Sequence, residues 1–486
     1  MNVTIYEINT RVWLKRFGAN NISEVPDGYW MGLKNKGIDY VWLMGIWKTC
    51  GDLVEKYCFE DGLIKSYSGA LKDWKKEDVI GSPFAVDVYD VNPSLGNEQI
   101  LSEFKMKLNK LGLKLILDFV PNHFSTGTSL LKTNPEIFLS VSKEVYERDT
   151  NTFFRPDESV EKYFAHGRDP FFPAWLDTVQ VNFYSQQARE YHCGTLKKLT
   201  SLCDGVRCDV AMLALNNVFK NTWGGALSQK YSSGNLDEFW HTAISTLKSI
   251  RSDFIFIAET YWDLEWDLQQ LGFDYTYDKK LTDKLRFGNA KAVREHLHAH
   301  IEYQSKSVRF LENHDETRAL SALGKARSKA AAVIISTIPG MRFYNDGQFE
   351  GKKKRLPVQL GREPVEPPSK DIFEFYDKIL SIINNNIFKV GTWENLKIEK
   401  AWEENNTFQN LLAWQWSLND SRRIVIVNYS DIVSTCRIKL NMEGYPEEII
   451  IKDLLNDKLY TRLTEEIHHV GLYVELKPWQ SHIFAF

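Results

Sequence analysis

The sequence predicts an α/β fold: a (β/α)8 or TIM barrel with a small inserted domain after the third strand and a C-terminal antiparallel β-sandwich. Three observations support this fold class. Short β-rich apolar runs alternate with longer amphipathic stretches, one gap between runs is too long for a single helix, and the pattern changes after about Val390.

Eight runs rich in apolar and β-branched residues indicate the barrel strands. Runs that are apolar almost throughout are typical of parallel strands buried on both faces. They cover residues 3–8, 40–47, 113–120, 204–210, 254–260, 273–278, 308–313 and 336–345. The stretch from Glu98 to Gly112 illustrates the segments between them, because its apolar residues recur at the spacing of one helix face and a glycine ends the pattern.

The segment between the third and fourth strands exceeds the length of one crossover helix. From His123 to about Asn182 it is rich in polar residues, proline and phenylalanine, which favours a small subdomain inserted over the barrel mouth. We therefore expect the barrel to comprise residues 1–122 and 183–388, and the insertion to comprise residues 123–182.

The last part of the chain, residues 389–486, consists of short alternating runs separated by turn residues. An example is RRIVIVNYS, and the chain ends in another such run, HIFAF. Alternation of this kind predicts antiparallel strands with one face buried, and several together favour a sandwich.

Composition narrows the range of partners. The 486 residues carry a formal net charge of −4, so the chain offers no basic field for nucleic acid and no polybasic membrane anchor. No apolar run is long enough to span a bilayer, and the N-terminus lacks a signal-peptide pattern. The six cysteines form no CxxC pair and indicate reduced thiols. We expect a cytoplasmic protein that binds neither nucleic acid nor membrane.

The carboxyl ends of the predicted strands carry a compact set of ionisable and polar residues. In a (β/α)8 barrel these ends meet at one face, where functional groups gather. The set is Asp118, Asn122 and His123 after the third strand, Arg207 and Asp209 at the fourth, Glu259 at the fifth, and His314, Asp315 and Glu316 at the seventh.

Cleavage of a glycosidic bond requires such a set. One carboxylic acid protonates the leaving oxygen, and a second carboxylate meets the oxocarbenium-like carbon. Arg207 precedes Asp209 by two residues, so both point to the same side of a strand and the arginine can keep the carboxylate ionised. Taken singly, each carboxylate could equally cap a helix or join a structural ion pair, and each histidine could be a structural hydrogen-bonding residue. The ordered combination favours catalysis.

Four segments resemble the signature regions of glycoside hydrolase family 13, the α-amylase family, in the family's order. They are DFVPNH (118–123), DGVRCDVAM (204–212), IAETYW (257–262) and FLENHDE (310–316). GSPFAVDVYDVNPSLG (81–96) and GMRFYNDGQFEG (340–351) resemble two further motifs of the family. The resemblance covers the barrel, the insertion (the family's domain B) and the C-terminal domain.

This resemblance implies roles for the acidic residues at the mouth. Asp209 corresponds to the nucleophile, Glu259 to the general acid and base, and Asp315 to the third carboxylate, which binds sugar hydroxyls. Arg207 corresponds to the cation that orients and ionises Asp209.

Substrate-binding roles follow in the same way for five further residues. His123 and His314 correspond to hydrogen-bond donors to the ring being cleaved, and Asp118 to a residue that supports the site. Phe84 and Trp262 are placed to pack against sugar, although core packing explains them equally well.

The sequence departs from the family pattern at two places, one that bears on substrate specificity and one that bears on metal binding. Many α-amylases carry Lys-His where this chain has Met212 and Leu213, which replaces polar recognition by apolar surface. At the family's calcium site Asn122 is retained, but Trp175 stands where an aspartate is usual. A hard cation prefers several oxygen ligands, so we expect no metal and no cofactor.

The sequence thus predicts a retaining α-glycosidase that acts on α-linked oligosaccharides or polysaccharides through a covalent glycosyl-enzyme. One alternative is an α-glucan transglycosylase, of the 4-α-glucanotransferase or maltosyltransferase type, which would use the same catalytic residues. A remote alternative is a carbohydrate-binding protein without turnover.

Overall fold

The computed structural model describes residues 2–157, 162–227 and 236–486. Eight parallel strands close a barrel in which each strand pairs with its neighbours in chain order, which confirms the predicted (β/α)8 architecture. The strands are β1 (Thr4–Asn9), β2 (Tyr40–Met44), β5 (Lys114–Phe119), β11 (Gly205–Cys208), β12 (Ile255–Ala258), β13 (Tyr275–Tyr277), β14 (Ser307–Arg309) and β15 (Met341–Asn345).

Helices surround the barrel and begin where the sequence supplies caps. The side chains of Asn97, Ser185 and Asp278 accept hydrogen bonds from backbone N–H groups in the first turns of α5, α8 and α12. The helices associated with the barrel are α1 (Thr10–Trp13), α2 (Asp27–Asn35), α3 (Val54–Tyr57), α4 (Asp61–Ala70), α5 (Glu98–Lys110), α8 (Gln186–Leu202), α9 (Asn216–Trp223), α10 (Phe239–Ile250), α11 (Glu265–Gln270), α12 (Lys279–Phe287), α13 (Ala290–Leu297), α14 (Ile301–Ser305), α15 (Ala319–Thr337), α16 (Lys370–Ile383) and α17 (Ile387–Val390).

Several strands are shorter than the apolar runs that predicted them. The run 40–47 divides, since β2 ends at Met44 and Trp47 begins β3 (Trp47–Thr49), which pairs with β4 (Val86–Val91). The run 336–345 also divides, because α15 continues to Thr337 and β15 begins only after Pro339 and Gly340. Apolar composition marks burial, and buried residues at the end of a helix or strand extend the run beyond the element itself.

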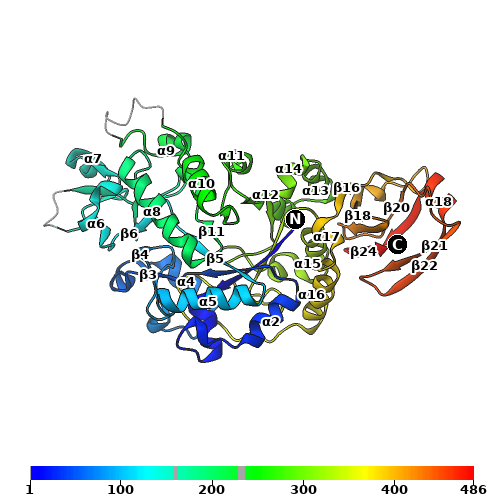
Figure 1. Cartoon of the computed structure of the whole chain (residues 1–486), viewed down its shortest axis with the longest axis horizontal. Coiled ribbons are helices and arrows are strands. Elements are labelled where there is room, and N and C mark those ends of the chain that lie inside the picture. The colour runs from blue at the N-terminus through cyan, green and yellow to red at the C-terminus, as the bar shows by residue number, and fades with distance from the viewer. Residues whose placement is uncertain (1, 158–161, 228–235) are drawn as a thin grey trace.

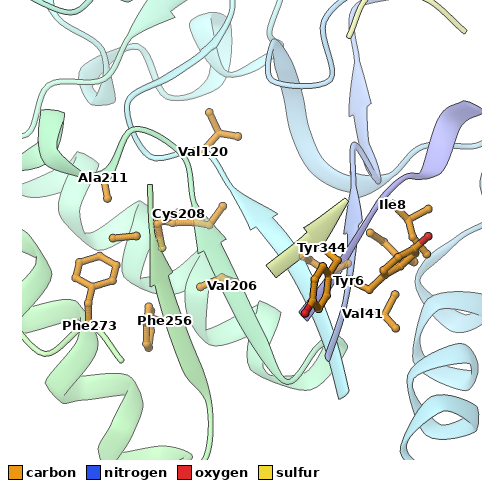
Figure 2. Packing of buried hydrophobic residues seen from close by; sticks show 14 of the residues in the cluster. Tyr6, Ile8, Val41, Val120, Val206, Cys208, Ala211, Phe256, Phe273 and Tyr344 are labelled. Atoms are coloured by element: carbon orange, nitrogen blue, oxygen red, sulfur yellow. The ribbon is translucent and has the colours of Figure 1, made fainter. Parts of the chain in front are cut away.

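Apolar side chains occupy both faces of the barrel wall. Inside, alternate residues such as Ile5, Ile116 and Ile257 form one cluster. Outside, the strands pack against the helices, and Figure 2 shows Val206, Cys208, Phe256 and Phe273 among these side chains. Cys208 is fully buried in this outer cluster, away from the neighbouring Arg207 and Asp209.

Between β5 and β11 the chain forms two small antiparallel sheets. One pairs β6 (His123–Ser125) with β10 (Thr178–Gln180), and the other joins β7 (Ser140–Val141), β9 (Tyr163–Ala165) and β8 (Phe153–Phe154). The segment also holds α6 (Leu130–Thr133) and α7 (Lys143–Arg148). Residues 158–161 of the predicted insertion lie outside the described residues.

The C-terminal part forms two antiparallel sheets at the opposite end of the molecule from α7 (Figure 1). The larger contains β16 (Thr392–Asn395), β18 (Leu411–Leu418), β19 (Ser421–Asn428), β24 (Ser481–Ala485), β21 (Glu448–Asp453) and β22 (Lys458–Leu463). The smaller contains β17 (Ile398–Glu399), β20 (Ser434–Ile438) and β23 (Leu472–Leu476), and α18 (Thr464–His469) precedes β23. Apolar residues of both sheets share one core, as expected of a sandwich.

The larger sheet is joined to the barrel. The indole N–H groups of Trp414 and Trp416 both donate to the carbonyl of Thr337 at the end of α15, at 3.0 and 2.6 Å. Side chains of β18 and β19 belong to the same apolar cluster as the barrel helices. None of the helices described is both long enough and apolar enough to cross a lipid bilayer.

Candidate active site

The carboxyl ends of β11 and β12 bring Arg207, Asp209 and Glu259 into direct contact. One terminal nitrogen of the Arg207 guanidinium binds Asp209 Oδ1, and the other lies 2.8 Å from Glu259 Oε2. Arg207 is 1% exposed, so both carboxylates are held by a cation that water does not screen. Trp42 and Phe84 face this guanidinium, with ring centroids 5.0 and 5.4 Å from it.

Glu259 has two further hydrogen-bond donors. The backbone N–H of Val210 donates to Oε2 at 2.7 Å, and the Tyr261 hydroxyl donates to Oε1 at 2.8 Å. Val210 adopts a left-handed backbone with φ 37°, which is unusual for a β-branched residue. Such strain persists only where surrounding contacts determine it, and here it aims an N–H at the carboxylate.

Burial sets the protonation of the two carboxyl groups. Burial and the nearby Asp209 and Asp315 raise the pKa of Glu259, against the opposing effect of Arg207. Burial also raises the pKa of Asp209, but its direct ion pair with Arg207 favours the ionised form. Two buried carboxyl groups that share one cation favour a state with one proton between them, as an acid and nucleophile pair requires.

At the end of β14, His314 and Asp315 form the other side of the site. His314 Nδ1 lies 2.5 Å from Glu7 Oε1, and Nε2 lies 3.1 Å from Asp315 Oδ2. Burial alone would lower the pKa of His314, but Asp315 and Glu7 outweigh it and raise the pKa well above its ordinary value. Desolvation would raise the pKa of Asp315, but His314 outweighs it and lowers the pKa to about 2. Asp315 is therefore an anion.

Of the remaining predicted residues, His123 and Phe84 line a hollow beside the carboxylates, and Asp118 lies behind it. His123 and Phe84 line the large hollow, and burial lowers the pKa of His123 to about 4, so it is neutral. Asp118 lines no described hollow, because its oxygens accept from Trp42 Nε1 at 3.0 Å and from the Gly45 N–H at 2.7 Å. Burial raises the pKa of Asp118 to about 6. Asp118 thus holds the β2 loop in place.

These groups surround a hollow of about 1060 Å³, lined by Asp209, Glu259 and Asp315 together with His123 and Phe84. Trp262 is not part of this lining. It has φ 61°, its side chain is partly exposed, and it lines a second hollow that shares Val210 with the first. The two hollows meet at the residue that follows Asp209.

Gln180 binds Asn122 at the position of the family's calcium site. Gln180 Nε2 donates to both the side-chain and backbone oxygens of Asn122, at 2.9 and 3.0 Å. The side-chain oxygen of Asn122 is one that a cation at the family's calcium site would need, and an N–H donor binds it instead. Trp175 packs its ring at 5.2 Å from His123 and supplies no ligand. Among residues 2–157, 162–227 and 236–486, no group of three or more His, Cys, Asp or Glu side chains could hold a metal ion.

Sequence reasoning missed three residues that contact His314, Glu259 or Asp315. Glu7, Tyr261 and Arg355 bind His314, Glu259 and the Asp315 carbonyl, respectively. Glu7 left a detectable signal, since it is a lone carboxylate on the inward face of an apolar strand, two residues after Ile5. Tyr261 and Arg355 lie in loops whose paths no periodicity predicts.

Comparison with known proteins places this geometry in context. The family model described as "Alpha amylase, catalytic domain" matches residues 82–420. Alpha-amylase 3 of Dictyoglomus thermophilum is 22% identical over 420 residues, covering 76% of this chain and 77% of that protein. A cyclomaltodextrinase of Thermoanaerobacter pseudethanolicus is 23% identical over 317 residues, covering 62% of this chain and 51% of that protein.

The fold has close structural counterparts. The crystal structure of a maltogenic α-amylase from Thermotoga neapolitana superposes with a TM-score of 0.69 at 20% identity, covering 100% of this chain and 98% of that one. The likeness therefore extends over the barrel, the insertion and the C-terminal sheets.

Proposed function

The chain belongs to the α-amylase family, and on that basis we propose that it is a retaining α-glycosidase acting on α-glucans or malto-oligosaccharides. The observation that carries the proposal is the shared guanidinium: Asp209 and Glu259 bind one buried Arg207 and line one hollow. Hydrolysis in this family requires a charged nucleophile and a protonated acid side by side, and a single cation between two carboxyl groups favours that combination.

In the first step, Glu259 gives its proton to the glycosidic oxygen as the bond from that oxygen to the anomeric carbon breaks. The Asp209 carboxylate forms the new bond to the same carbon, which yields a covalent glycosyl-enzyme. The fixed charge of Arg207 keeps Asp209 ionised, and the anionic Asp315 is available to accept hydrogen bonds from ring hydroxyls.

In the second step, Glu259 acts as a base. Its carboxylate takes a proton from water, the water oxygen bonds to the anomeric carbon, and the bond to Asp209 breaks. Two inversions at one carbon retain its configuration.

Transglycosylation is the second candidate, in which a sugar hydroxyl replaces water. Met212 and Leu213 stand where many members of the family carry Lys-His, and Met212 favours transglycosylation by placing an apolar side chain in the wall of the second hollow.

Product analysis tests both candidates. We expect maltoheptaose to yield new reducing ends and shorter chains if water is the acceptor, and chains longer than the input if a sugar is. A wild-type protein that leaves maltoheptaose and other α-glucans unchanged would contradict the proposal.

A further inference from the structure

Glu7 is a buried carboxylate that neither step of hydrolysis uses. It lies on β1, is 1% exposed, and points into the barrel like Ile5 two residues before it. It does not line the catalytic hollow. A carboxylate in such a place is costly unless a cation pairs with it, and an apolar side chain would fill the space without that cost. The reason for its presence therefore lies in the group that it binds.

That group is His314, which is bound at both ring nitrogens. Nδ1 lies 2.5 Å from Glu7 Oε1, and Nε2 lies 3.1 Å from Asp315 Oδ2. A carboxylate at each nitrogen favours the imidazolium, in which both nitrogens carry a proton to donate. The rings of Trp42 and Phe84 pack against the imidazole, with centroids at 5.6 and 5.2 Å. These contacts fix both the orientation and the protonation of the ring.

The charges around His314 leave Glu7 and Asp315 as the groups that set its state. Asp118, in β5, also interacts with its charge, and Arg207 lies against the same two aromatic rings. On its remaining side His314 borders a narrow cavity whose charged groups pair elsewhere. The pairs are Arg16 with Asp346 and Glu363, Lys352 with Glu363, Arg318 with Glu312, and Arg355 with the Asp315 carbonyl.

His314 acts in turn on Asp315, the carboxylate that reaches the catalytic hollow. The Asp315 side chain is 52% exposed, lines the hollow and pairs with His314. A side chain that a fixed cation already holds has less conformational freedom to lose when a sugar binds. Glu7 can affect this order only through the imidazolium between the two carboxylates.

We propose that Glu7 is a positioning residue: through Nδ1 it keeps His314 protonated and oriented, and His314 then holds Asp315 in place to accept hydrogen bonds from the hydroxyls of the bound sugar. The inference rests on the proposed glycosidase function and deepens it by assigning a residue behind the site.

The first test follows the proton on His314 directly by NMR. In protein with isotope-labelled histidine, the ring resonance of His314 is the one that disappears in His314→Asn. Because two carboxylates hold its proton, we expect the wild-type ring to stay an imidazolium up to about pH 8, beyond the ordinary histidine pKa of about 6.5. In Glu7→Gln, which keeps the shape and removes the charge, the ring should titrate lower by about one pH unit or more.

The second test measures whether this proton matters for turnover. A neutral His314 bound to Gln at position 7 no longer donates to Asp315, so the activity of Glu7→Gln should fall as pH rises through the lowered midpoint. We expect the ratio of kcat/KM on maltoheptaose at about pH 8 to that at about pH 6 to drop about tenfold below the wild-type ratio. Asp453→Asn is the matched control, because it removes a buried carboxylate 2.5 Å from His482 Nδ1 in the sandwich, and it should leave the ratio unchanged.

A double variant separates action through His314 from action on the fold. We expect Glu7→Gln to change kcat/KM little further in a His314→Asn background, and effects of equal size with and without His314 would overturn the inference. An unchanged titration of His314 in Glu7→Gln would do the same, as would titration near about pH 6.5 in the wild type, which needs no Glu7 variant. A wild-type protein that leaves maltoheptaose and other α-glucans intact would instead refute the glycosidase function, while the ring titration would still report the contact with Glu7.

Discussion

Asp209 and Glu259 bind the two different terminal nitrogens of one guanidinium, that of Arg207, which holds the two carboxyl groups next to each other. Among the residues that the structure describes, the Asp209 carboxylate pairs with Arg207 alone, whereas Glu259 also receives the Val210 N–H and the Tyr261 hydroxyl. This asymmetry suits the two carboxyl groups to different roles.

Asp209→Asn removes the attacking carboxylate but preserves the shape of the side chain. We expect kcat on maltoheptaose to fall by about 10⁴-fold or more, with oligosaccharide affinity by calorimetry close to that of the wild type. Equal activity would refute the nucleophile assignment. A wild-type protein that binds α-glucans without turning them over would instead support a binding function.

Tyr261→Phe removes a donor to the general acid. Because hydrogen bonds to a carboxylate stabilise its ionised form, losing one should raise the pKa of Glu259 further and move the basic limb of the kcat/KM profile upward by about one pH unit. Tyr429→Phe, which removes a buried hydroxyl bonded to the Leu285 carbonyl, is the control. A basic limb that stays in place would show that Tyr261 does not act on the acid.

His314→Asn leaves Glu7 buried without its cation. We expect a loss of about 3 kcal/mol in the free energy of unfolding at pH 6, measured with urea. The folded pKa of His314 is raised, so the stability it contributes is complete below its unfolded pKa of about 6.5 and is lost as pH rises through the folded value. The difference between variant and wild type should therefore shrink as the pH rises through the raised folded pKa of His314. The exposed His298→Asn should cost little at either pH, and a pH-independent loss in His314→Asn would contradict the ion pair.

Chelation tests the Asn122–Gln180 contact. Because an amide N–H of Gln180 occupies the Asn122 side-chain oxygen that a cation would use, we expect the same Tm in excess EDTA and in added calcium. Gln180→Ala should lower Tm under both conditions, since it leaves the buried side-chain oxygen of Asn122 without its donor. A fall of several degrees on EDTA treatment of the wild type would show that a metal binds.

The barrel could be predicted from the sequence because the patterns that indicate its strands and helices are local. Buried parallel strands read as continuous apolar runs, and caps such as Asn97 mark where helices begin. The spacing of Arg207 and Asp209 also predicted their contact, since residues two apart on a strand point to the same face.

The rest depends on contacts between distant parts of the chain. Glu7 and His314 are separated by 307 positions, and only the closure of the barrel makes them neighbours. Val210 and Trp262, which line the second hollow, have left-handed backbone that periodicity does not encode. The motif implies a supporting role for Asp118, but it does not reveal the partners, Trp42 and the Gly45 N–H, which come from another strand and its loop.

The paired indole contacts to Thr337 bear on how this molecule denatures. Trp414 and Trp416 anchor the sandwich to the last turn of α15, and one apolar cluster continues from the barrel helices into the sandwich. Unfolding of either the barrel or the sandwich would therefore remove packing contacts from the other. Calorimetry should accordingly record a single endotherm. A fragment that lacks the C-terminal sheets would expose the apolar surface that they cover and would tend to aggregate.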